Sequence, residues 1–202
     1  MMTQAKLKFA SFEDYLIWSD EPENAMEGQF EWIDGELVEV PPESGPNDAI
    51  ANRIFFYLVS AGIVPLDLIR PGKCEIQVPV LQLKDAANRY PDLVILREEH
   101  LALTQKRLTI KLDMPPPRVV AEVLSPGKQN RERDLFRKRN QYAARAIPEF
   151  WLIDPETHTV KVLRYQDRAY RELGVSRGGE RILSSEFPEL LLTAGQVFGT
   201  GQ

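Results

Sequence analysis

Two carboxylates in apolar runs carry the chemistry that this sequence suggests. Glu122 lies within Val119–Leu124, where every other residue is apolar, so it is predicted to sit in a buried strand. An ionised carboxylate there is costly unless it is paired or holds a cation.

Asp92 opens a second apolar run directly after Pro91. If the two strands are neighbours, their carboxylates can converge, and then one is protonated or a divalent cation lies between them. Mg²⁺ suits such an all-oxygen site. Taken singly, Asp92 is also typical of a turn and Glu122 of a salt bridge.

Lys138 is the third candidate, and it lies on a predicted helix. The helix is expected from about Asn130 to Ala146 and ends before Pro148. Residues four apart share a helix face, so Asp134, Lys138 and Tyr142 form one stripe. With apolar neighbours on this stripe, Lys138 is expected to point inward, where a desolvated ammonium can position a water. The alternative is a surface lysine paired with Asp134.

The composition is typical of an ordinary folded protein. Of the 202 residues, 43% are hydrophobic and 27% are charged, and we expect residues 1–202 to form a single domain. No apolar run is long enough to span a membrane. The N-terminus is too polar and too acidic for a signal peptide, so a cytoplasmic protein without a membrane partner is expected.

Other catalytic chemistries find little support in the side chains available. Cys74 is the only cysteine, and the two histidines, His100 and His158, stand far apart. Neither a thiolate zinc site nor a nucleophilic triad is therefore predicted.

The net charge of −5 and the pI near 5.2 argue against a bulk electrostatic nucleic-acid binder. A local basic stretch nevertheless exists, and it is either a phosphate-contacting patch or a solvated helix face. Its members are Lys128, Arg131, Arg133, Arg137, Lys138, Arg139 and Arg145.

Helices and strands are predicted along the whole chain. A short helix follows Ser11, a hairpin turns at Asp34–Gly35, and an amphipathic helix covers about 47–61. The strands expected around the Asp92 run are "LDLIR", "CEIQVPV" and "PDLVIL", with "QLKDAANRY" as a loop between the last two. "EFWLID", "TVKVLRY" and "AYRELG" follow the long helix. This order predicts an α/β or α+β fold with a central mixed sheet flanked by helices.

Several of these segments together resemble a known protein family. They are "FEWIDGELVEVPPES", "YPDLVIL", "PPPRVVAEVLSPGKQNRERD", "KRNQYAARAIPEFWLIDPE" and "SSEFPELLLTAGQVF". The chain resembles the Uma-two family of bacterial restriction-endonuclease-like proteins, within the PD-(D/E)XK nuclease superfamily, over roughly Phe12 to Phe198. The resemblance implies the core of that superfamily and Mg²⁺-dependent phosphodiester hydrolysis, with Mn²⁺ as a possible substitute.

The resemblance also implies roles for individual residues. Asp92 matches the aspartate of the Pro-Asp motif and Glu122 the acid of the second motif. Both would bind the metal, together with the Val123 carbonyl. Glu31 matches an early family glutamate that reaches the metal through water. The superfamily pattern places lysine two residues after the acid, where this chain has Leu124, and Lys138 would replace it.

Two further positions bear on the resemblance. Asn47 stands where many relatives carry histidine. Ser125 matches a family serine and is expected to act as a cap.

Three functions remain open at this level. The first is a Mg²⁺-dependent DNA endonuclease, acting as a homodimer because two-strand cutting favours paired sites. The second is a catalytically silent protein of the nuclease fold that serves as a DNA-binding or assembly module. The third is a metal-dependent hydrolase of RNA or of a smaller phosphodiester. No base-reading element is visible, so sequence specificity is not predicted.

Overall fold

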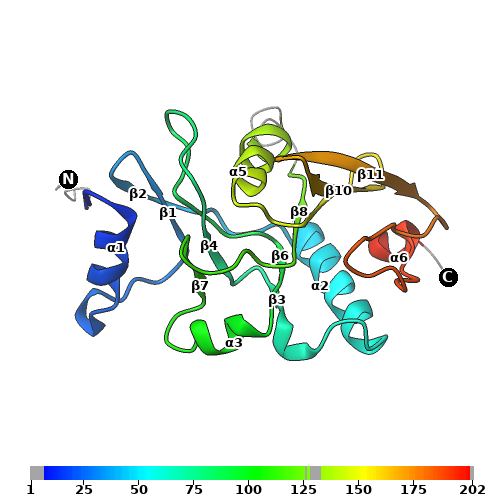
Figure 1. Cartoon of the computed structure of the whole chain (residues 1–202), viewed down its shortest axis with the longest axis horizontal. Coiled ribbons are helices and arrows are strands. Elements are labelled where there is room, and N and C mark those ends of the chain that lie inside the picture. Colours follow the sequence, from blue (N-terminus) through cyan, green and yellow to red (C-terminus); the bar gives the residue numbers. More distant parts are fainter. Residues whose placement is uncertain (1–6, 126, 128–132, 201–202) are drawn as a thin grey trace.

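A six-stranded mixed sheet forms the centre of the computed structural model, which describes residues 7–125, 127 and 133–200 (Figure 1). In spatial order its strands are β11 (Ala169–Arg177), β10 (Thr159–Gln166), β9 (Glu149–Asp154), β8 (Val119–Val123), β6 (Leu93–Ile95) and β3 (Ile69–Pro71). β8 and β9 run parallel, and all other neighbours in this sheet are antiparallel. The predicted central mixed sheet is therefore confirmed.

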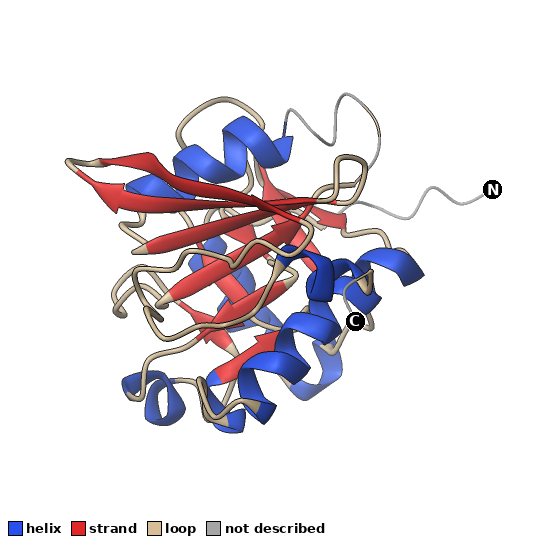
Figure 2. Ribbon diagram, turned by 90° about the vertical axis from the view of Figure 1, so that its right-hand side faces the viewer, coloured by secondary structure: helices blue, strands red, loops and turns tan. Residues whose placement is uncertain are grey.

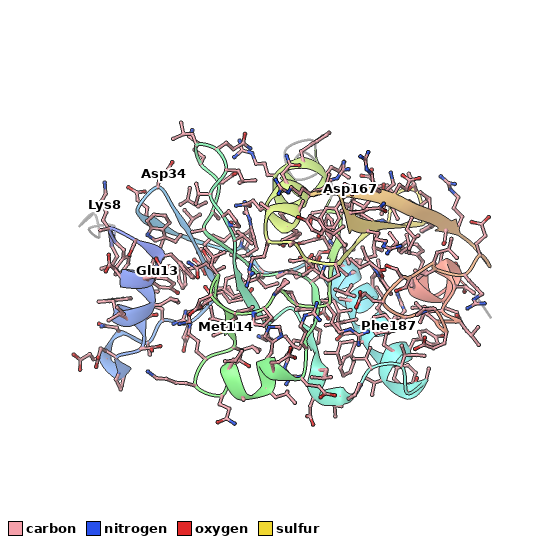
Figure 3. All side chains as sticks on the ribbon, viewed as in Figure 1. Lys8, Glu13, Asp34, Met114, Asp167 and Phe187 are labelled. Carbon is pink, nitrogen blue, oxygen red and sulfur yellow. The ribbon has the colours of Figure 1, made fainter. Side chains whose placement is uncertain are left out.

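Two small sheets extend the molecule away from the central one. The hairpin of β1 (Phe30–Ile33) and β2 (Glu36–Glu39) turns at Asp34 and Gly35, which both have positive φ (49° and 88°), as a tight hairpin turn requires. Figure 3 shows Asp34 at the tip of this hairpin. The second sheet has the order β5 (Asn88–Arg89), β4 (Glu75–Gln77) and β7 (Thr109–Ile110). β4 lies within the predicted strand "CEIQVPV", which is thereby confirmed. β5 and β7 are too short to leave a periodic pattern, and β5 lies inside the segment predicted as a loop.

Helices cover both faces of the central sheet (Figure 2). On one face lies α5 (Arg139–Ala144), whose Tyr142 ring meets Phe150 of β9 edge-on at 5.3 Å. On the other face α2 (Gly45–Ser60) packs against β3, β8 and α6 (Ala194–Phe198). The remaining helical segments lie outside these layers. They are α1 (Phe12–Ser19), α3 (Glu99–Leu103) and the 3₁₀ turns Pro22–Asn24 and Leu66–Leu68.

The caps of two helices explain where they begin. Ser11 accepts a hydrogen bond from the Asp14 N–H at the start of α1, as predicted. Ser44 does the same for the Asn47 N–H, and it starts α2 two residues earlier than predicted. Asn47 is thus brought into the first turn of α2. No helix in the described part of the chain is long and apolar enough to cross a membrane.

The long helix before β9 differs from its prediction. Residues 130–132 lie outside the described part, Arg133–Lys138 form a π-helix, and only Arg139–Ala144 are α-helical. A π segment holds more residues per turn than an α-helix, so the backbone before Lys138 is not the continuous α-helix that was predicted. The predicted stripe holds between Lys138 and Tyr142, whose side chains both reach Glu122. The Asp134 side chain lies outside the described residues.

Candidate functional site

Neighbouring strands bring the two predicted carboxylates together. β6 pairs with β8 so that Leu93 faces Ala121, and this register continued by one residue sets Asp92 opposite Glu122. Residues directly opposite in an antiparallel pair project from the same face. The Val123 N–H donates to Asp92 Oδ2 at 2.6 Å, which fixes Asp92 against the end of β8. Asp92 itself lies just before β6 rather than within it.

Two described side chains donate to Glu122, one from the end of the π-helix and one from α5. The Lys138 ammonium donates to Glu122 Oε2 at 2.5 Å, and the Tyr142 hydroxyl donates to Glu122 Oε1 at 2.6 Å. All three side chains are buried, and Tyr142 is fully enclosed. Because Lys138 and Tyr142 are four residues apart across the start of α5, both reach the same carboxylate. The inward-facing lysine predicted from the sequence is confirmed, whereas the role of Tyr142 was not foreseen.

Burial and the neighbouring charges of Glu122 and Lys138 determine the electrostatics at Asp92. Part of Asp92 remains open to solvent, yet its carboxyl group lies largely within protein. This burial raises its pKa well above the usual value, and the Glu122 carboxylate raises it further. The Lys138 ammonium and the Val123 N–H act in the opposite direction. Burial, followed by the Glu122 charge, also raises the pKa of Tyr142, so its hydroxyl stays a donor.

The donor set is compatible with a hard divalent cation. Asp92 Oδ1 accepts no hydrogen bond from any residue that the structure describes, and it lies beside a second carboxylate. Two carboxylates with several waters are the ligands that Mg²⁺ commonly takes. No group of three or more His, Cys, Asp or Glu side chains that could hold a metal gathers within the described ranges, so the described residues offer two acids here. The Val123 carbonyl as a ligand stays a prediction.

Glu31 lies in a hydrogen-bond network beside the Asp92 and Glu122 site. Its Oε2 accepts from Arg89 Nη1 at 2.9 Å, and Arg89 also donates to Gln141 Oε1 through Nε and Nη2 (2.9 and 2.8 Å). Gln141 in turn donates to the carbonyls of Pro79 and Ala86 at 2.8 Å each. This network ties α5 to the β4–β5 hairpin. Sequence reasoning missed Arg89 and Gln141 because neither belongs to a pattern. The water-mediated role of Glu31 stays a prediction.

Asn47 and Ser125 connect α2 to the loop that follows β8. The Asn47 amide donates to Ser125 Oγ at 3.4 Å, and Asn47 is buried. Most of the segment that follows Ser125 lies outside the described residues, so its role as a helix or turn cap stays a prediction. The contact places the first turn of α2 beside the carboxyl end of β8.

The basic stretch is mostly engaged within the protein. Arg145 is buried and donates to the carbonyls of Lys111 and Met114. Arg137 pairs with Asp85 at 3.4 Å, and Arg139 donates to the Tyr170 carbonyl at 3.2 Å. Lys128 and Arg131 lie outside the described residues, as does the Arg133 side chain. Of the seven basic residues, Lys138 and Arg145 are therefore core groups rather than members of an exposed patch.

Comparison with known proteins shows the fold and the family of this chain. A solved structure described as a putative nuclease belonging to DUF820 from Anabaena variabilis ATCC 29413 matches with a TM-score of 0.63 and 19% sequence identity, covering 98% of this chain and 99% of that one. No match was found among curated proteins. The family model described as "Putative restriction endonuclease" matches residues 12–195, which include Asp92, Glu122 and Lys138. The chain belongs to the Uma2 family.

Proposed function

We propose that this protein is a nuclease that cleaves phosphodiester bonds in DNA with the help of Mg²⁺ or Mn²⁺. The observation that carries the proposal is the convergence of Asp92 and Glu122 next to a buried Lys138. The family description and the description of the structural neighbour support the same reaction class. Fold likeness alone would not suffice, because one fold can host several functions.

Each residue has a distinct part in the proposed reaction. Asp92 and Glu122 would hold the metal ion, which would supply Lewis acidity at the phosphate and lower the pKa of a bound water. Lys138 donates to Glu122 and its charge acts on Asp92, so its ammonium would orient the attacking water or neutralise charge on the phosphate. Glu31, through Arg89 and Gln141, would keep α5 and therefore Lys138 in place.

A cleavage assay with matched variants tests this proposal. Supercoiled, linear and single-stranded DNA would be incubated with the purified protein and Mg²⁺ or Mn²⁺. We expect Asp92→Asn, Glu122→Gln and Lys138→Met each to lower the cleavage rate by about 100-fold or more, the usual cost of removing a group that stabilises the transition state. Asp113→Asn is the control, because this acid is exposed and its contact to Lys111 is long at 3.9 Å. Wild-type protein that cuts none of these substrates would overturn the proposal.

A second candidate is a nuclease-fold protein that binds DNA or a partner without cutting. It is favoured by one observation: both Glu122 oxygens already accept hydrogen bonds from protein groups. This candidate predicts DNA binding that is unchanged by Mg²⁺ and by Glu122→Gln. Light scattering after gel filtration would test the proposed homodimer in the same samples.

A further inference from the structure

Tyr142 and Lys138 hold the two oxygens of Glu122 in different ways. The Tyr142 hydroxyl reaches Oε1 from a ring that is fully buried and packed edge-on against Phe150. Its helix is fastened by the neighbouring Gln141, which donates to two carbonyls of the β4–β5 hairpin. The hydroxyl of a tyrosine is joined to the backbone through a rigid ring and a single methylene group. This hydrogen bond cannot be released without leaving a buried hydroxyl unpaired.

The Lys138 side chain has more conformational freedom than the Tyr142 side chain. Its ammonium stands at the end of a flexible four-carbon chain, and 9% of the side chain is exposed to solvent. It also lies at the junction between the π-helix and α5. An incoming divalent cation would bring the same sign of charge to Oε2 and would compete with the ammonium for that oxygen. Oε2 is therefore the exchangeable position of Glu122.

We propose that Tyr142 is a positioning residue that makes Glu122 a one-oxygen metal ligand through Oε2, and that Lys138 occupies this oxygen until the metal ion displaces it. The proposal rests on the metal-dependent function proposed above and adds metal selectivity to it. Mg²⁺ and Mn²⁺ accept single carboxylate oxygens in a six-ligand shell, whereas Ca²⁺ takes more ligands and often both oxygens of one carboxylate. A hydrogen bond on Oε1 weakens that oxygen as a ligand and so disfavours Ca²⁺.

The test measures metal binding rather than cleavage. Dissociation constants for Mn²⁺, Mg²⁺ and Ca²⁺ would be measured by calorimetry, and by electron paramagnetic resonance for Mn²⁺, on the full chain without DNA. In Tyr142→Phe we expect Ca²⁺ affinity to rise about tenfold relative to Mn²⁺, on the order of one added ligand bond. The matched control is Tyr170→Phe, which removes another buried hydroxyl, one that donates to the Ile147 carbonyl at 2.9 Å. Its Ca²⁺ to Mn²⁺ ratio should equal that of the wild type.

Lys138→Met tests the exchange at Oε2. Removing the competing ammonium should tighten binding of all three metals by about tenfold while cleavage is lost. Either of two results would overturn the inference. One is a ratio of Ca²⁺ to Mn²⁺ affinity in Tyr142→Phe that lies within twofold of the ratio in Tyr170→Phe. The other is weaker metal binding by Lys138→Met than by the wild type.

The wild type provides a measurement of its own if Tyr142→Phe does not fold. It must then bind Mn²⁺ at least about tenfold more tightly than Ca²⁺, and equal affinities would refute the inference. If cleavage depends on metal but the ratio of Ca²⁺ to Mn²⁺ affinity is unchanged in Tyr142→Phe, the proposed function still holds and only the role of Tyr142 is refuted. If the wild type binds no metal, both the proposed metal-dependent function and the role of Tyr142 are refuted.

Discussion

Two buried glutamates on neighbouring strands have opposite surroundings. Glu122 lies in β8 opposite Leu152 of β9, whereas Glu149 of β9 lies opposite Val119. Because side chains alternate along a strand, the two carboxylates project from opposite faces of the sheet. Glu122 faces α5, and Glu149 faces the segment that leads to α6. Both side chains are almost completely removed from solvent.

Their hydrogen-bond donors differ in kind. Glu149 accepts five hydrogen bonds, from the Trp151 indole, the Ser184 hydroxyl, the Ser185 hydroxyl and N–H, and the Glu186 N–H. All five donors are neutral groups, three on side chains and two on the backbone. Glu122 instead accepts from a charged ammonium on a long side chain and stands beside a second acid. A buried carboxylate with fixed neutral donors anchors structure, while one that shares a cation with another acid can exchange that cation.

The largest expected effect is the loss of stability on removing the Glu149 charge. Glu149→Gln places an amide NH₂ against N–H and O–H donors, so we expect it to lower the free energy of unfolding by roughly 3 kcal/mol. For a chain of this size that corresponds to a fall in Tm of roughly 6–12 °C. Thermal and urea unfolding would measure it.

Glu122→Gln makes the same substitution at the other buried glutamate and serves as the comparison for Glu149→Gln. It should cost less than half as much stability, because the loss of one negative charge also relieves its repulsion with Asp92. It should still abolish cleavage. Equal destabilisation by the two variants would contradict the distinction between an anchoring and an exchanging carboxylate.

The sequence shows one of these glutamates much more clearly than the other. Glu122 stands out because it interrupts an apolar run, and Lys138 and Tyr142 follow from helical spacing. Glu149 opens the run "EFWLID" next to Pro148 and looks like a residue at the end of a strand. Its donors at Ser184 and Ser185 lie 35 and 36 residues further along the chain. No local pattern connects positions so far apart.

The same limit applies to the fold. The long strands and the β1–β2 hairpin were predictable because alternation and turn residues are local signals. The two-residue strands β5 and β7 exist only through pairing with β4. The π-helix that ends at Lys138 has no local signal in the sequence, so spacing alone predicted a continuous α-helix.

The pH dependence of stability separates Asp92 from an ordinary surface acid. The pKa of Asp92 is raised by burial and then by Glu122. Its protonation therefore stabilises the fold: the contribution is complete below the unfolded pKa of about 3.9 and is lost as pH rises through the folded pKa. In the presence of a chelator, the stability of the wild type relative to Asp92→Asn should fall from pH 5 to pH 8. Urea unfolding at several pH values would measure this difference.

Asp20→Asn is the control with the opposite sign. The hydrogen bond from Lys106 lowers the pKa of Asp20, so its contribution is present above the unfolded value and is lost only as pH falls below it. Between pH 5 and pH 8 its stability difference from the wild type should stay constant. A flat Asp92→Asn profile would mean that the Asp92 carboxyl is better solvated than its surroundings indicate.

The smallest effect tests whether the Glu149 donors are purely structural. Ser185→Ala removes one of the two bonds that Ser185 makes to Glu149 Oε2 and leaves the backbone N–H in place. We expect a loss of about 1 kcal/mol, the usual net value of one hydrogen bond. Cleavage rate and Mn²⁺ affinity should be unchanged, because Glu149 projects from the face of the sheet opposite to Asp92 and Glu122. A change in metal affinity would show that the two faces are coupled through β8 and β9, and the carboxylates could then no longer be treated as independent.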